Sequence, residues 1–117
     1  MGRRTGGRLL FAPIYEAIDD ALLSAIAQAD VALLDGSFYS DDELRANVLM
    51  DKGARDLGHL PVGDPGGTLD RLADVRTRVI FTHLNNSNPM LDPNSEAARR
   101  IGARGFEIAY DGLEVRL

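Results

Sequence analysis

The sequence of 117 residues contains no cysteine, and its only two histidines are His59 and His83. Without cysteine, the chain can form neither disulfides nor thiolate metal sites. A metal ion would have to be bound by imidazole, carboxylate, backbone oxygen or water instead. The absence of cysteine therefore leaves few side chains that could act as strong metal ligands.

Basic charge and long apolar runs are also scarce. The chain has 13 lysine and arginine residues against 18 aspartate and glutamate residues, which gives a net charge of −5. Proteins that bind nucleic acid normally present a basic face, so we expect no nucleic-acid partner. The apolar segment 9–14 is interrupted by Pro13 and is too short for a signal peptide or a membrane span. The composition predicts a soluble, cytoplasmic protein with no membrane partner.

What the sequence does contain is an alternation of strand and helix patterns. Residues 8–12 and 31–34 are apolar runs typical of buried strands, and apolar residues recur at helical spacing over 15–29. A strand, a helix and a strand in so short a segment predict two parallel strands joined by a right-handed crossover. With a third strand at 78–82, the sequence predicts an α/β fold.

The remaining segments predict shorter elements within one domain, 1–117. Further helices are expected from Ser40 to about residue 50, over 68–73, and over 93–103. Near the C-terminus, polarity alternates on both sides of Asp111-Gly112, a pair that favours a β-hairpin with a type I′ turn. Residues 1–6 are expected to form a flexible tail.

Asp35, His59 and His83 each stand near a point where an apolar run gives way to a loop. A strand end carries side chains to the rim of a sheet, where α/β proteins place their sites. Imidazole and carboxylate groups are common ligands of zinc and iron. We therefore expect the three side chains to converge at one edge of the sheet, close enough to share a ligand or an ordered water.

Each of these residues also has a purely structural interpretation. A histidine at a strand end is often held by hydrogen bonds, and the residues alone slightly favour this interpretation for His83. Asp35 before Gly36 is typical of a turn in which the carboxylate binds its own downstream amides. His59 lies in a Gly/Pro turn, as an ordinary loop residue would. Spacing and composition leave both interpretations open.

The loop that follows His83 is rich in asparagine, with Asn85, Asn86 and Asn88 before Pro89. Short amide side chains can tie an irregular loop together. They can also orient a neighbouring histidine or bind a substrate carboxylate. The residues by themselves favour neither interpretation of the three asparagines.

Four segments, taken in order, resemble the C-terminal part of a known family. They are 33–39 with 41–43, then 57–61, 81–92 and 110–117. The family is that of pyrroloquinoline quinone (PQQ) biosynthesis protein B, in the metallo-β-lactamase superfamily, and its most specific element here is His-x-Asn-Asn-x-Asn-Pro at 83–89. The resemblance implies the C-terminal half of an αββα sandwich, with a mixed sheet, helices and a C-terminal β-hairpin.

The resemblance also implies roles for the candidate residues. His83 matches the last metal-binding histidine of the superfamily. Asp35 and His59 match positions that lie beside the metals of related hydrolases and relay protons, and they are the catalytic candidates. Asn85, Asn86 and Asn88 match the family's own loop and are the candidates for substrate binding.

The chain departs from the family in its length. A complete member is more than twice as long, and its N-terminal half supplies the metal motif rich in histidine and aspartate. At 13–16, after the first strand, this chain has Pro-Ile-Tyr-Glu where many members place a metal-bridging aspartate. We therefore expect a half-domain with one bare sheet face, covered by a second copy of the chain or by a separate N-terminal half, and only weak metal binding by the chain alone.

The resemblance implies a metal-dependent step in PQQ biosynthesis, hydrolytic or oxygenase-type, on a small-molecule or peptide-derived quinone precursor. Zinc or iron is the expected cofactor if a partner completes the site, and no cofactor is expected otherwise. The alternative is a non-catalytic truncated paralogue that acts as a binding or accessory module.

Overall fold

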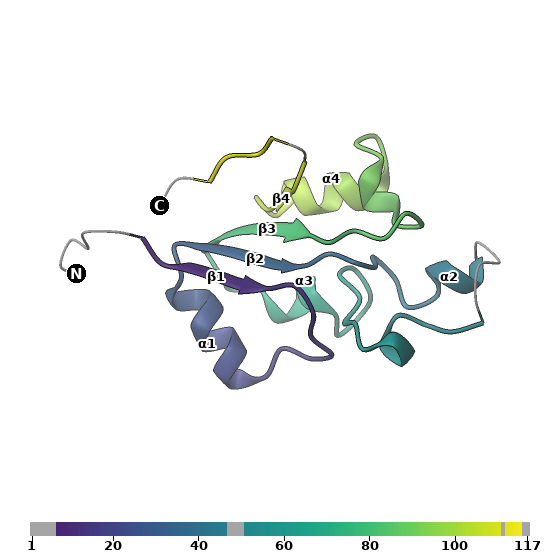
Figure 1. The fold of residues 1–117 in the computed structure, drawn as a ribbon, viewed down its shortest axis with the longest axis horizontal. Helices are drawn as coiled ribbons and strands as arrows, with labels where there is room; N and C mark the ends of the chain where they lie inside the picture. The colour runs from purple at the N-terminus through teal and green to yellow at the C-terminus, as the bar shows by residue number, and fades with distance from the viewer. Residues whose placement is uncertain (1–6, 47–50, 111, 116–117) are drawn as a thin grey trace.

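The structure, a computed structural model, describes residues 7–46, 51–110 and 112–115. The flexible tail expected at residues 1–6 lies outside these ranges. Along the chain the elements are β1 (Leu9–Ala12), α1 (Asp20–Gln28), β2 (Val31–Asp35), α2 (Glu43–Ala46), η1 (Arg55–Leu57), α3 (Thr68–Arg71), β3 (Arg78–Thr82), η2 (Pro89–Leu91), α4 (Glu96–Ala103) and β4 (Glu107–Ile108) (Figure 1). No helix in the described ranges is both long and apolar enough to span a membrane.

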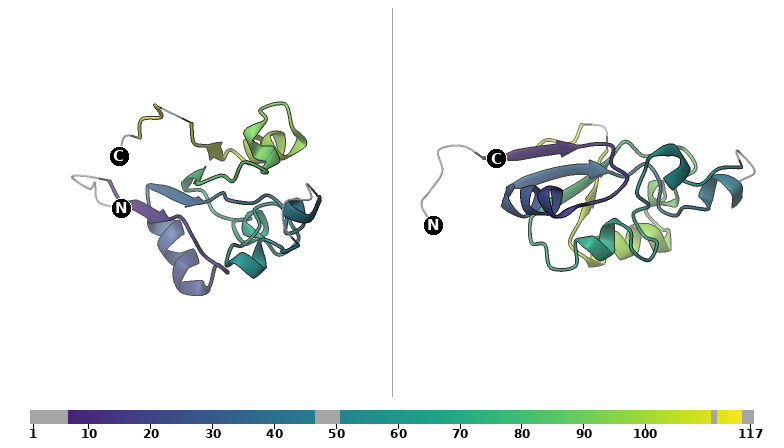
Figure 2. Two further views of the ribbon diagram at one scale, coloured as in Figure 1. Left: turned by 45° about the vertical axis from the view of Figure 1, so that its right-hand side comes forward. Right: turned by 90° about the horizontal axis from the view of Figure 1, so that it is seen from below.

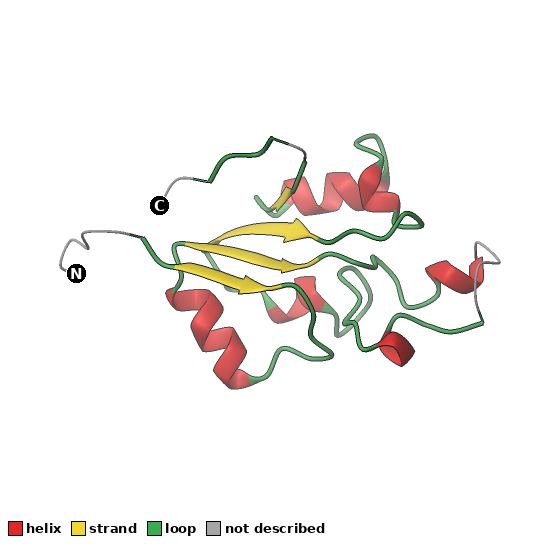
Figure 3. Ribbon diagram, viewed as in Figure 1, coloured by secondary structure: helices red, strands yellow, loops and turns green. Residues whose placement is uncertain are grey.

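The strands form one sheet in the order β1-β2-β3-β4, and every neighbouring pair is parallel. Leu33 of β2 is the register partner of Phe11 in β1 and of Ile80 in β3. The predicted α/β fold and the parallel β1–α1–β2 unit are therefore confirmed. Figure 3 shows the loops and short helices that lie between β2 and β3.

The expectation of a mixed sheet with a C-terminal hairpin is wrong for the described residues. β4 pairs parallel with β3, and Ala109 N–H extends this pairing by donating to the Phe81 carbonyl at 2.8 Å, so every described pair of neighbouring strands is parallel. A turn does form, because Leu113 N–H donates to the Tyr110 carbonyl at 3.1 Å. Residues 112–115 nevertheless contain no strand, and residues 111, 116 and 117 lie outside the described ranges.

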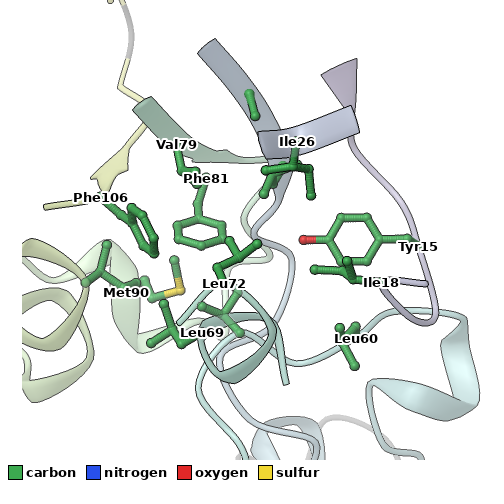
Figure 4. Close-up of a cluster of buried hydrophobic side chains, with 14 of the residues drawn as sticks. Tyr15, Ile18, Ile26, Leu60, Leu69, Leu72, Val79, Phe81, Met90 and Phe106 are labelled. Atoms are coloured by element: carbon green, nitrogen blue, oxygen red, sulfur yellow. The ribbon is translucent and has the colours of Figure 1, made fainter. Parts of the chain in front are cut away.

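One face of the sheet carries the hydrophobic core. Ala32, Leu34, Val79 and Phe81 point to this face and are 0% exposed. They pack against side chains of three helices and the adjoining loops (Figure 4): Tyr15, Ile18, Ile26, Leu69, Leu72, Met90, Ala97, Ile101 and Phe106. Figure 2 shows these helices gathered on one side of the strands. On the other face, Leu9 and Phe11 of β1 are 51% and 62% exposed.

The first helix begins later than its apolar spacing predicts. α1 starts at Asp20, and the side chain of Asp19 caps it by accepting a hydrogen bond from Leu22 N–H at 2.8 Å. Tyr15, expected inside the helix, instead accepts a hydrogen bond at its carbonyl from Leu60 N–H at 2.8 Å. Its hydroxyl lies 3.3 Å from Thr68 Oγ1, and burial raises the pKa of this phenol. Tertiary contacts thus override local helical spacing.

Two other helix starts show how capping decides a boundary. The predicted helix 93–103 begins at Glu96, because Ser95 accepts a hydrogen bond from Ala98 N–H at 3.0 Å and is the N-cap. After Ser40 the described helix is α2, and the Glu43 carboxylate accepts from Ser40 N–H at 3.3 Å, as the predicted capping spacing requires. The C-terminal part of that predicted helix, 47–50, lies outside the described residues.

Candidate functional site

Asp35 is the last residue of β2, and its side chain is completely buried. One carboxylate oxygen, Oδ1, accepts a hydrogen bond from Ser37 N–H at 3.0 Å, as expected for a turn residue. The other, Oδ2, lies 2.7 Å from Nδ1 of His59. Because a carboxylate can only accept, His59 donates its Nδ1–H to Asp35. One oxygen therefore binds the turn and the other binds His59, while the catalytic role of Asp35 stays a prediction.

His59 lies in the loop after η1, and 15% of its side chain is exposed. The left-handed residue Gly58 (φ 84°) precedes it. Phe38 packs edge-on against the imidazole, with ring centroids 5.5 Å apart and an interplanar angle of 72°. A buried carboxylate and an aromatic ring thus fix the orientation of the His59 ring.

His83 follows the last residue of β3 and is exposed. Its Nδ1 lies 3.2 Å from the hydroxyl oxygen of Ser37. Among the described residues other than glycine, only His83 has a positive φ, at 64°. A side chain in this region of backbone space carries about 1–3 kcal/mol of strain, and such strain is concentrated at functional sites. The backbone turns sharply at the candidate metal ligand.

Ser37 is a site residue that the sequence reasoning missed. Its N–H contacts Asp35 and its hydroxyl contacts His83, so it joins two of the predicted residues. Its position depends on Gly36, whose N–H donates to the Thr82 carbonyl at 2.8 Å. A Cβ at Gly36 would lie 2.9 Å from that carbonyl oxygen, so the close approach of the two strand ends requires glycine. The Asp-Gly-Ser order at the end of a buried strand was the available signal.

The predicted convergence of Asp35, His59 and His83 is seen in the geometry. Asp35 contacts His59 directly and is joined to His83 through Ser37. Asp35 ends β2, Ser37 and His83 lie in the loops that follow β2 and β3 at the carboxyl edge of the sheet, and His59 lies in the loop after η1. The catalytic and metal-binding roles given to these residues remain predictions.

The asparagine loop is tied to the same turn. Asn88 is buried, and its amide nitrogen donates to the Gly36 carbonyl at 2.7 Å and to the Ser37 carbonyl at 3.2 Å. The backbone N–H of Asn85 donates to the Ser37 carbonyl at 3.0 Å. Asn86 is exposed. Asn85 and Asn88 therefore hold the loop in place, while a role of the asparagines in substrate binding stays a prediction.

The donor set fits one ligand of a metal site rather than a whole site. In the described ranges, no group of three or more histidine or acidic side chains is arranged to hold a metal ion. Both oxygens of the buried Asp35 carboxylate accept hydrogen bonds, from Ser37 N–H and from His59 Nδ1–H. Stable zinc sites generally use at least three protein ligands. The described residues therefore provide His83 as a candidate ligand and lack the rest of the site.

Comparisons with known proteins show which proteins the chain resembles and how much of them it covers. No family model matches the chain. Coenzyme PQQ synthesis protein B of Pseudomonas putida is 39% identical over 115 residues, which is 97% of this chain and 38% of that protein. Protein B of Methylococcus capsulatus is 42% identical over 113 residues, which is 96% of this chain and 37% of that protein.

A solved structure extends the likeness to the fold. The 1.98 Å crystal structure of Zn(2+)-bound PqqB from Methylobacterium extorquens matches with a TM-score of 0.92 and 33% identity, over 98% of this chain and 42% of that one. The fold is therefore of the metallo-β-lactamase-like α/β class. Within that class, the chain matches the C-terminal part of coenzyme PQQ synthesis protein B, and it spans less than half the length of these relatives.

Proposed function

We propose that the chain provides the C-terminal part of a metal-dependent enzyme of PQQ biosynthesis, similar to coenzyme PQQ synthesis protein B. The observation that carries this proposal is the convergence of Asp35, His59 and His83 on one turn. The match to coenzyme PQQ synthesis protein B of Pseudomonas putida, which covers 97% of this chain, supports it. We expect a hydrolytic or oxygenase-type reaction on a peptide-derived quinone precursor.

In this proposal the residues of the site have separate tasks. His83 contributes one ligand to a zinc or iron ion whose other ligands come from outside the described residues. Asp35 holds His59 with Nδ1 protonated, so that Nε2 is the nitrogen that accepts or releases a proton beside the site. Among the asparagines, the exposed Asn86 is the candidate for substrate contact, while Asn85 and Asn88 hold the loop.

The partner in this proposal is the part that precedes the matched region in the relatives. It would cover the sheet face opposite the helices, where Leu9 and Phe11 are exposed and Leu33 is partly buried. Two observations support this partner: an apolar sheet face normally packs against a second layer, and the chain spans 38% of the Pseudomonas putida relative. A second copy of the chain is the rival occupant of the same face.

The test is to mix the chain with a separately produced N-terminal part of the Methylococcus capsulatus relative and to measure complex formation and bound metal. We expect a one-to-one complex that holds stoichiometric metal, while the chain alone binds metal weakly. His83→Ala should abolish metal binding and leave the complex intact, whereas His59→Ala should weaken metal binding only partly. Tight stoichiometric metal on the chain alone that survives His83→Ala would contradict the proposal, and a homodimer without complex formation would favour the rival occupant.

The second candidate function is a non-catalytic binding or accessory module. The observation that favours it is the lack of a metal-binding cluster within the described ranges. In the same experiment, a complex that forms without metal and does not change on His83→Ala would support this function. The two candidates therefore give opposite results for metal content in one measurement.

A further inference from the structure

The turn 35–37 holds both imidazoles of the site, and it holds each through the same ring nitrogen. Asp35 Oδ2 lies 2.7 Å from Nδ1 of His59, and Ser37 Oγ lies 3.2 Å from Nδ1 of His83. Within the described part of the chain, Nε2 of neither ring has a hydrogen-bond partner. The turn thus leaves the same nitrogen available on both rings.

The backbone of Ser37 is fixed independently of His83. Its N–H donates to Asp35 Oδ1 at 3.0 Å, and its carbonyl accepts from Asn85 N–H at 3.0 Å and from Asn88 Nδ2 at 3.2 Å. The residue is 4% exposed. A hydroxyl on such a constrained residue occupies a defined position and can therefore orient a more mobile group.

The ring of His83 needs such support. It is exposed, and its backbone is in the left-handed region with φ 64°, so neither burial nor a common backbone conformation fixes the imidazole. The contact with Ser37 Oγ is the hydrogen bond that the structure gives its side chain. The orientation of the ring therefore depends on this serine more than on packing.

We propose that Ser37 is a positioning residue for His83. Its hydroxyl oxygen accepts the Nδ1–H of the neutral ring, so that Nε2 carries the lone pair. Histidines that bind metals generally donate their other ring N–H to a fixed acceptor, which sets the tautomer and the ring orientation. The link to metal binding rests on the proposed function, whereas the tautomer of His83 is a property of the chain itself.

The tautomer can be measured by NMR on the chain labelled with 15N in its histidines, at a pH above the ordinary histidine pKa of about 6.5. We expect the Nδ1–H form of His83 in the wild type and a mixture of tautomers in Ser37→Ala. Ser87→Ala is the matched control, because Ser87 lies in the loop that contains His83 but contacts Glu43 and Asn85. Ser37→Thr keeps a hydroxyl and should keep the Nδ1–H form.

Two NMR results would overturn the proposal. One is the Nε2–H tautomer of His83 in the wild type, a measurement that needs no variant to fold. The other is a Ser37→Ala variant that is folded, by its dispersed amide spectrum, and has the wild-type tautomer. Either would mean that Ser37 does not set the ring.

A zinc titration separates this proposal from the proposed function. In the mixture of the chain with the N-terminal part of the relative, Ser37→Ala should raise the Kd for zinc about 10–100-fold. An unchanged Kd in a folded variant would contradict a positioning role. If His83 keeps the Nδ1–H form but its signals do not respond to zinc, the proposed function fails, and the bond between Ser37 and His83 stands.

Discussion

The two faces of the sheet have similar residue types but different surroundings. On the helix-covered face, Phe81 is completely buried, and its ring packs edge-on against Phe106 at 6.2 Å. On the other face, Phe11 is 62% exposed although it lies in a strand of the same sheet. The exposed apolar side chains of this second face belong to β1, because Val31 and Ile80 on the same face are only 3% and 0% exposed. The difference teaches that an apolar residue in a strand need not be buried within this chain, as Phe11 shows.

The strongest test of this comparison replaces Phe81 with alanine. Removing a fully buried phenylalanine leaves a cavity, and we expect Phe81→Ala to lower the free energy of unfolding by about 3–5 kcal/mol. Urea denaturation followed by circular dichroism measures this change. A loss well under 1 kcal/mol would mean that the core on the helix-covered face is not packed as described.

At the carboxyl edge of the sheet, burial of a charged group gives the next largest effect. Asp35→Ala removes an acceptor for His59 Nδ1–H and for Ser37 N–H, and should lower the free energy of unfolding by about 1–3 kcal/mol. The exposed Asp74 is the matched control, and Asp74→Ala should change it by less than about 0.5 kcal/mol. Equal effects of the two variants would show that the Asp35 contacts do not stabilise the fold.

The same truncation on the bare face should have little effect on the chain alone. Because Phe11 is mostly exposed, Phe11→Ala should change the free energy of unfolding by less than about 0.5 kcal/mol. It should instead weaken binding to the N-terminal part of the relative by at least about fivefold in Kd, as truncation of an interface aromatic does. Calorimetric titration measures this Kd. Unchanged binding would remove the face of β1 from the proposed interface.

The smallest effect is expected at the ion pair between Arg78 and Glu107, which joins β3 to β4 at 2.7 Å. The hydrogen bond from Arg78 lowers the pKa of Glu107, so this carboxylate stabilises the fold above its ordinary pKa. That contribution is lost as the pH falls through the lowered pKa. Both side chains are 38% exposed, so solvent screens the pair. Glu107→Gln should lower the melting temperature slightly near neutral pH and not in acid, and a loss that is equal at both pH values would contradict this account.

Much of the fold could be predicted from the sequence because its central strands contain uninterrupted apolar runs at 31–34 and 79–81. Short runs of this kind favour strands buried within a sheet, and the helix between the first two strands indicates a parallel crossover. The positions of Asp35 and His83 at strand ends follow from the same pattern. Their placement at the sheet edge was therefore predictable before any contact was known.

Contacts between distant segments decided the rest, because hydrogen-bond partners far apart in sequence leave no local pattern. Leu60 N–H donates a hydrogen bond to the carbonyl of Tyr15, so the first helix begins only after Asp19. Ala109 N–H donates to the Phe81 carbonyl, a contact across 28 residues that makes β4 a parallel neighbour of β3. Ser37 lies 46 residues from His83 in the chain, yet its hydroxyl lies 3.2 Å from the ring. The sequence by itself determined which residues reach the sheet edge, whereas only the tertiary structure decided which atoms hold them, since that choice depends on how the loops after β2 and β3 pack together.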